Sequence, residues 1–403
     1  MGRSVASNAL TFFVLLLVAI AGFLEWSKQQ YTGPGPLTQP ICLRVEKGES
    51  VTSLSDKLMK DGAISHAMIF RVGASYADKT DKIKFGSYLV PEHASMQGIL
   101  GIVTKGGQST CGTEVNYRIG VTASEMVVRE LDPVEGKYQE VAKFDPASKD
   151  KAPAEYAKVV AEPDTRFRVI LAEGVTSYDV SNALGHADFL SGKIATTPKE
   201  GSLAPDSYEV TKEEDRAKLI EEMQGRQAKI LKDAWDQRDE DLPYKTPEEA
   251  LTMASLVEKE TGVPGERPEV ASVFVNRLNK GMRLQTDPAV IYGITKGKGV
   301  LGRGLRQSEL KRKTPYNTYE IDGLPPTPIC NPGKSAIEAA LHPADTKYLY
   351  FVANGTGGHA FSDTLAAHNA NVAKWRALEA ERAKEGKAPS ADSSTGTGVS
   401  SGN

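Results

Sequence analysis

The chain has 403 residues, with 49 Lys and Arg against 52 Asp and Glu, and a formal net charge of -3. This length leaves room for two or three domains that each bury a core of their own. The balanced charge supplies no basic field of the kind that binds nucleic acid, so we expect no nucleic-acid partner. With 3 cysteines the chain is not a disulfide scaffold.

The amino terminus holds the only long apolar run, Ala9 to Leu24. It is shorter than the roughly 20 residues of a spanning helix, but Trp26 can extend it as an interfacial anchor. A cleaved signal peptide is the alternative, because Arg3 precedes the run, although no A-x-A-like site follows. We expect residues 1–30 to form a cytoplasmic stub and a single-pass inner-membrane anchor, with the remainder in the periplasm.

Residues 31–40 are a Pro-rich spacer, and a strand, a Gly turn and an amphipathic helix are predicted within the module 41–112. That module resembles LysM, a family of peptidoglycan-binding domains, through Val45, Gly48, Val51 and Leu54. The same strand, turn and helix pattern is predicted at 117–131 and 167–184, which indicates a second LysM-like region over 113–211. Its segment 132–165 is charged and is predicted to be a solvated insertion.

Cys42 and Cys111 flank the first module. In an oxidising compartment they would close a loop of roughly 70 residues, worth up to about 4 kcal/mol in the chain-entropy model. Three free thiols are an equally good interpretation, and Cys330 has no evident partner.

After a charged linking helix at 212–245, one well-marked helix is predicted from Thr246 to Gly262. Thr246 is its expected N-cap, Pro247 its first residue and Glu249 the partner in a capping box. Gly262 is expected to end it.

This helix carries two carboxylates near its end. At 100° per residue Glu260 falls on the apolar stripe of Met253, Leu256 and Val257, whereas Glu258 points elsewhere. A carboxyl on an apolar face, near the negative end of the helix dipole, has a raised pKa, as a general acid requires. The alternative is an ordinary solvated Glu.

The following segments carry the remaining candidates. A second helix is predicted from Arg267 to a stop at Gly281, followed by a loop with Gln285 and Asp287. Residues 314–333 add Tyr316, Asn317 and Tyr319 and a Pro-rich stretch. A buried strand at 348–353, a Gly-rich loop, a terminal helix and a disordered tail within 377–403 complete the chain.

Several segments together resemble the YceG-like endolytic murein transglycosylases. They are ASLVEKET, VFVNRLNKGMRLQTDPAVIYG, TPYNTY, GLPPTPICNPG, HPADTKYLYFVANGTGGHAFS and AAHN. The resemblance implies an α+β protein with an N-terminal transmembrane helix, LysM-like modules and a mainly helical, lysozyme-like catalytic domain over 246–376. It also implies that the protein is a lyase that acts in cell wall biogenesis, limits the length of glycan strands and thereby influences cell shape.

In lytic transglycosylases the catalytic Glu precedes Ser or Thr, so the resemblance selects Glu260, before Thr261, over Glu258. It implies a substrate-binding set in the matching segments, namely Asn276, Gln285, Tyr316, Asn317 and Tyr319. Glu260 would protonate the glycosidic oxygen between N-acetylmuramic acid and N-acetylglucosamine, and then deprotonate the muramyl 6-hydroxyl as a 1,6-anhydro ring closes. Asp287 is expected to be a cap or turn residue rather than a second acid.

The expected partners are peptidoglycan strands, the membrane and peptidoglycan synthases. The spacing of His342, His359 and His368 matches no zinc motif, so we expect no metal, and no cofactor motif occurs. Two alternatives stay open: a hydrolytic muramidase, whose products carry one extra water, and a non-catalytic peptidoglycan-binding scaffold.

Overall fold

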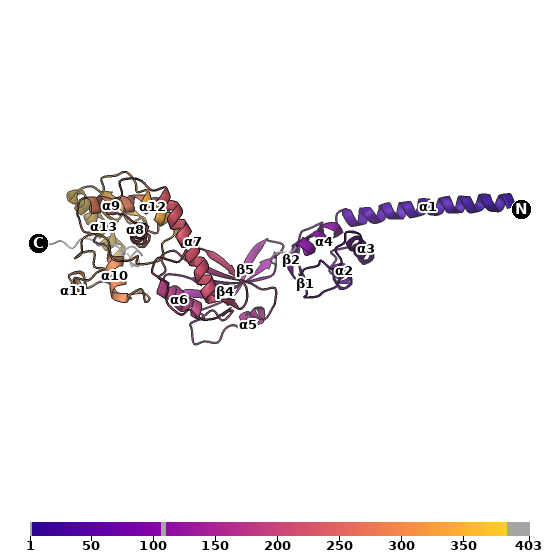
Figure 1. Ribbon diagram of the computed structural model, residues 1–403, viewed down its shortest axis with the longest axis horizontal. Coiled ribbons are helices and arrows are strands. Elements are labelled where there is room, and N and C mark those ends of the chain that lie inside the picture. The colour runs from indigo at the N-terminus through magenta and orange to yellow at the C-terminus, as the bar shows by residue number, and fades with distance from the viewer. Residues whose placement is uncertain (1, 106–109, 385–403) are drawn as a thin grey trace. The chain divides into compact units, whose positions relative to one another are not determined.

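The computed structural model describes residues 2–105 and 110–384 (Figure 1). Helices and strands are mixed along the chain, so the α+β class predicted from the sequence is confirmed. Of the predicted tail, residues 385–403 lie outside the described residues. The chain divides into two compact units. The first comprises residues 1–116, 127–144 and 151–167, and the second comprises residues 117–126, 145–150 and 168–403.

The first unit begins with one long apolar helix, α1 (Gly2–Thr32). Its segment Asn8–Thr32 is long and apolar enough to cross a membrane, as a signal sequence can also be, and its apolar stretch is not buried against the rest of the protein. The end of the helix packs on the module that follows. The Trp26 ring lies 5.2 Å from the His66 ring, and Tyr31 covers Gly73 so closely that a Cβ there would clash.

That module is built from β1 (Ile41–Val45), α2 (Val51–Lys60), α3 (Ala67–Tyr76), β2 (Gly86–Val90) and α4 (Met96–Lys105). Strands β1 and β2 pair antiparallel, with Ile41 opposite Val90 and Val45 opposite Gly86. The turn before α2 uses Gly48 at φ +79°, and the Ser50 side chain caps the helix by accepting from the Ser53 amide. The predicted strand, Gly turn and helix are therefore present.

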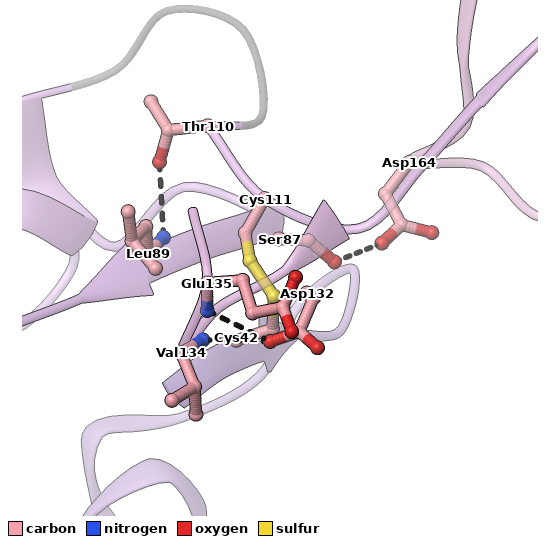
Figure 2. Close-up of a disulfide and its surroundings, with 9 residues drawn as sticks. All are labelled: Cys42, Ser87, Leu89, Thr110, Cys111, Asp132, Val134, Glu135 and Asp164. Carbon is pink, nitrogen blue, oxygen red and sulfur yellow. Dashed lines mark hydrogen bonds between the residues drawn. A yellow bond between two sulfur atoms is a disulfide. The ribbon is translucent and has the colours of Figure 1, made fainter. Parts of the chain in front are cut away.

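The first unit contains a disulfide between Cys42 and Cys111, whose Cα atoms are 5.6 Å apart (Figure 2). Hydrogen bonds hold the same segment, because the Ser87 carbonyl accepts from the amides of Thr110 and Cys111 at 2.9 and 3.1 Å. The cross-link thus ties β1 to the residues that directly precede strand β3 (Thr113–Ile119). Cys330 is the free, buried cysteine.

A five-stranded sheet has the order β5-β4-β3-β6-β8. Its strands are β3 (Thr113–Ile119), β4 (Ser124–Asp132), β5 (Lys137–Phe144), β6 (Arg166–Leu171) and β8 (Ser207–Val210). Along the chain, helix α5 (Ala154–Val160) precedes β6 and helix α6 (Ser177–Gly185) follows it. The short strands β7 (Leu190–Ser191) and β9 (Glu214–Asp215) pair in a separate two-stranded sheet.

The helix predicted to end at residue 131 is wrong, because residues 124–132 form strand β4. Met126, Val127 and Val128 are all buried in succession, and β-branched residues favour a strand with both faces covered. The charged segment 132–165 contains β5 and α5. Most side chains of β5 are exposed, which explains why its sequence shows no apolar alternation.

Helices dominate the end of the second unit, where Figure 1 shows α8, α9 and α12 gathered together. The elements are α7 (Arg216–Asp236), α8 (Pro247–Glu260), η1 (Pro264–Glu266), α9 (Arg267–Asn279), α10 (Asp287–Thr295), α11 (Gln307–Leu310), α12 (Lys334–Leu341), β10 (Tyr350–Ala353), β11 (His359–Ser362) and α13 (Leu365–Lys384). Helix α8 packs against α12, α9 and α7, and its residues Met253, Leu256 and Val257 are fully buried.

The ends of α8 show how far its capping could be predicted. The Thr246 hydroxyl accepts from the Glu249 amide at 3.2 Å, as predicted, but the Glu249 carboxylate accepts from the amide of Lys245 rather than that of Thr246. The helix ends at Glu260, two residues before Gly262, because Thr261 is extended at φ -139° and ψ 129°. The Thr261 hydroxyl accepts from the Val263 amide and holds this turn.

Candidate active site

Glu260, the last residue of α8, is a buried carboxyl of the second unit whose pKa is raised well above its ordinary value. Its residue surface is only 6% exposed because it continues the buried stripe of the helix. Burial raises the pKa of Glu260 to about 7, and the negative charge of Asp287 adds to the rise, while the Thr286 hydroxyl and Arg277 act in the opposite direction. Near neutral pH this side chain therefore exists in both protonated and ionised forms.

Arg277 lies near Glu260 but does not neutralise it. Its guanidinium donates to the carbonyls of Leu349 and Leu284, each at 2.7 Å. Within the described part of the chain Glu260 forms no ion pair, and the Thr286 hydroxyl makes no hydrogen bond of normal geometry. The Glu260 carboxyl is thus a buried acid without a bound counter-charge.

Glu258 has a different environment on the same helix. Its carboxylate accepts from the Gly333 amide at 3.0 Å and lies 3.4 Å from the Arg267 guanidinium, which also pairs with Glu173. Burial raises the pKa of Glu258, the Gly333 hydrogen bond and Arg267 lower it, and the charge of Glu173 raises it. Glu258 therefore acts as a link that holds the start of α12 and the start of α9 to α8.

Two loop segments meet beside Glu260, residues 284–287 and 316–319. The Gln285 amide donates to the Thr318 carbonyl at 3.1 Å, and the Thr286 amide donates to the Thr318 hydroxyl at 2.9 Å. Gln285 has φ +55°, a left-handed conformation that is costly for a residue with a side chain. These bonds hold that strained residue in place.

Asp287 heads helix α10 and is bonded to a residue of the other loop. The Tyr319 hydroxyl donates to the Asp287 carboxylate at 2.6 Å. Burial raises the pKa of Asp287, and the Tyr319 hydrogen bond partly offsets this. The N-cap of α10 is Thr286, so Asp287 lies in the first turn of the helix.

A cavity of about 1270 Å³ lies in the second unit and is lined by Gln285, Asp287 and Tyr319, among others. Glu260 does not line the cavity itself, but Asp287, whose charge acts on Glu260, does. The volume exceeds the roughly 300–1,000 Å³ of pockets for small ligands, so it can accommodate a larger substrate such as an oligosaccharide.

Three other predicted residues lie outside the cavity lining. Asn317 is fully buried and its amide group donates to the carbonyls of Glu309, Leu310 and Arg312. The Asn276 amide group donates to two carbonyls of the loop at 346–348. Tyr316 shares a hydrogen bond of 2.8 Å with Thr327, and its ring lies 5.1 Å from that of Tyr292.

One wall of the cavity is a Gly-rich basic loop over residues 297–305, which sequence reasoning did not single out. Helix α6 holds it: the Thr176 hydroxyl donates to the Gly297 carbonyl at 2.6 Å, and the Gly299 amide donates to Asp179 at 3.2 Å. The run KGKGVLGRG, with Gly at every second or third position, is the signal that could have identified it.

The histidines occupy separate places. His359 is paired with Glu266 at 2.8 Å, His342 with Asp239 at 2.8 Å, and the His368 ring stacks on Tyr350 at 5.1 Å. Among the described residues no three His, Cys, Asp or Glu side chains gather in a group able to hold a metal ion.

Comparison with known proteins identifies relatives of the chain. The model of the YceG-like family matches residues 43–374. An endolytic murein transglycosylase of Bacillus subtilis (strain 168) is 46% identical over 132 residues, which are 33% of this chain and 36% of that protein. An endolytic murein transglycosylase of Streptococcus pneumoniae (strain D39) is 29% identical over 345 residues, which are 83% of this chain and 58% of that protein.

The chain therefore spans between about a third and three fifths of the length of these relatives. A crystal structure of a YceG-like protein from Listeria monocytogenes also matches, with 26% identity and a TM-score of 0.44, over 82% of this chain and 99% of that one.

Proposed function

The chain belongs to the YceG-like family, and from this premise we propose that it is a peptidoglycan lytic transglycosylase. The relatives named endolytic murein transglycosylases support this proposal and suggest cleavage within strands. The single observation that carries it is the buried Glu260 carboxyl, whose pKa is raised to about 7 and which forms no ion pair with a described residue.

One carboxyl is sufficient for this reaction because the nucleophile belongs to the substrate. Protonated Glu260 donates its proton to the glycosidic oxygen between N-acetylmuramic acid and N-acetylglucosamine, and the bond from that oxygen to C1 breaks. The resulting carboxylate then removes the proton of the muramyl 6-hydroxyl, whose oxygen bonds to C1. The product ends in a 1,6-anhydro ring, no water is consumed, and Glu260 is protonated again.

We propose that the cavity beside Glu260 holds the sugar chain. Gln285 and Tyr319 line it and would contact the acetamido groups of the substrate. Tyr316 would contribute through its ring beside α10, whereas Asn317 and Asn276 would act by fixing the loops that they bond.

The presence of Asp287 near Glu260 supports a second candidate function, that of a hydrolytic muramidase. Hydrolytic glycosidases place two carboxyl groups at the scissile bond, and Asp287 is a second carboxylate whose charge influences Glu260. The bond from Tyr319 occupies one oxygen of Asp287, which favours a positioning role. Mass spectrometry of the released ends decides between them, because hydrolysis adds the mass of one water and lytic cleavage does not.

We also propose that α1 anchors the protein in the inner membrane with the residues after α1 on the periplasmic side, where the chain would limit glycan strand length alongside synthases. A disulfide between Cys42 and Cys111 suits an oxidising compartment. The module with β1, α2, α3 and β2 would be a LysM-like contact to glycan. Membrane fractionation, with the mass of the intact protein, distinguishes an anchor from a cleaved signal sequence.

A further inference from the structure

The segment from Lys296 to Lys313 contains seven basic residues and only one acidic residue, Glu309. Four of the seven have partners within the protein. Lys296 lies over the Tyr316 ring at 5.3 Å, and Lys298 lies over the Tyr178 ring at 5.2 Å. Arg303 pairs with Glu309 at 2.6 Å, and the charge of Arg306 also acts on Glu309.

The other three basic residues, Lys311, Arg312 and Lys313, are consecutive and exposed. None of them forms an ion pair within residues 2–105 and 110–384. We call this group the cationic turn. Three adjacent like charges repel one another, and no ion pair with a described residue offsets that repulsion.

The backbone of the cationic turn is nevertheless fixed. The buried Asn317 amide group donates to the carbonyls of Glu309, Leu310 and Arg312 at 3.1, 2.9 and 2.7 Å. A buried amide with three acceptors, all in one turn, defines the position of that turn. The three cations are therefore presented from a rigid base, which lowers the entropic cost of binding a ligand there.

The cationic turn borders the cavity, because Leu310 and Lys311 are lining residues. Arg376 of α13 also lines the cavity and forms no ion pair with a described residue. The cavity carboxylates, in contrast, are engaged. Asp287 accepts from Tyr319, and Asp179 accepts from the Gly299 amide. The third, Glu320, lies 3.8 Å from the Arg283 guanidinium. The charge available to a ligand at this side of the cavity is positive.

We propose that the cationic turn binds the carboxylate groups of the peptide carried by the muramyl residue, so that the enzyme selects peptide-bearing strands. The inference rests on the proposed function, because it concerns the substrate of the same site. In a strand that carries its peptides the lactyl carboxyl of each muramyl residue is amidated and the sugars are neutral, so the carboxylates of the attached peptide are the anions that the strand brings to the cavity. Arg312 can bind a carboxylate through two parallel hydrogen bonds, and the lysines add point charge.

The test compares the full-length wild-type protein with the variant Lys311→Gln/Arg312→Gln/Lys313→Gln, both in detergent micelles. The substrates are strands that retain their peptides and strands from which an amidase has removed them. Removal leaves one lactyl carboxylate on each muramyl residue but takes away the carboxylates that lie further along the peptide, which are the groups that the cationic turn is proposed to bind. A matched control, Lys137→Gln/Lys149→Gln/Lys151→Gln, removes the same charge from exposed positions elsewhere. The readout is the ratio of kcat/KM on the two substrates, at low and at high salt.

We expect the wild type to prefer peptide-bearing strands, and the variant to lose roughly fivefold or more of that preference, chiefly through KM, because exposed charge pairs are each weak but three act together. High salt should reduce the wild-type preference in the same direction. The control should keep the wild-type ratio. Equal ratios for wild type and variant, or a wild type without preference, would overturn the inference.

Titration of both strands into the Glu260→Gln protein separates this inference from the proposed function. If wild type cleaves neither substrate, the proposed activity fails, while tighter binding of peptide-bearing strands that depends on the cationic turn would still support the inference. Cleavage of both substrates with no dependence on the turn leaves the proposed activity standing and removes the inference.

Discussion

Glu258 and Glu260 lie two positions apart on α8, yet of the two only Glu258 forms an ion pair with a residue that the structure describes, the Arg267 guanidinium at 3.4 Å. Glu258 also accepts from the Gly333 amide. Glu260 is buried beside Asp287 and Thr286, and its pKa is raised to about 7. The helix thus separates a carboxylate that holds structure from a carboxyl that can transfer a proton.

The pH dependence of the reaction should follow Glu260. As general acid it must be protonated, so kcat/KM should fall as the pH rises through about 7. In Asp287→Asn the amide keeps an acceptor for Tyr319 but removes the negative charge that raises the pKa of Glu260. The falling limb of the pH profile should therefore move to lower pH in this variant, and an unmoved limb would show that Asp287 does not act on Glu260.

Ionisation of Glu260 should make the folded protein less stable as the pH rises, whereas an ordinary paired carboxylate makes it more stable. The folded pKa of about 7 exceeds the ordinary value of 4.5, so between these values the folded protein holds a proton that the unfolded chain releases. Folding stability therefore falls as the pH rises through this window. The two pKa values differ by about 2.5 (7 minus 4.5), which corresponds to roughly 3 kcal/mol.

Glu260→Gln should remove this penalty. Its thermal unfolding midpoint should exceed that of wild type at about pH 8 and approach it at about pH 4. An equal difference at both pH values would mean that the substitution acts through packing and not through ionisation.

Glu258→Gln should lower the stability of the fold and have little effect on the catalytic activity. The substitution leaves the buried Arg267 with Glu173 as its remaining carboxylate partner. We expect a loss of about 1–3 kcal/mol in the free energy of unfolding. Product release at a temperature where the variant is folded should stay within a fewfold of wild type. A variant that is fully folded and inactive would indicate that Glu258 is the acid.

Reduction of the Cys42–Cys111 disulfide should destabilise the first unit. The bond spans 69 residues of sequence, which corresponds to about 4 kcal/mol in the chain-entropy model. Calorimetry of Cys42→Ser/Cys111→Ser should show a lower unfolding temperature for that unit. No change in stability would indicate that the cross-link does not constrain the unfolded chain.

Local patterns predicted the helices around the candidate site well. Residues 247–260 carry a cap, a Pro at the first position and an apolar stripe, and these signals need no knowledge of the rest of the fold. The segment 124–132 misled the prediction because its apolar residues fit a helix period, whereas pairing within the sheet determines its conformation.

The roles of Asn317 and the Gly-rich loop could not be predicted from local patterns. Asn317 bonds carbonyls five to eight residues away, and the loop is held by Thr176 more than a hundred residues earlier. Such contacts exist only once the chain is folded. The burial of Glu260, in contrast, could be predicted from the sequence, because it follows from the place of this residue on the apolar stripe of a single helix.

The most direct test of the central claim is to incubate intact glycan strands with wild type, Glu260→Gln and Glu258→Gln and to determine the released products by mass spectrometry. We predict that wild type and Glu258→Gln release fragments with 1,6-anhydro ends, without added water, and that folded Glu260→Gln releases none. Full activity of Glu260→Gln would contradict the assignment of Glu260 as the acid.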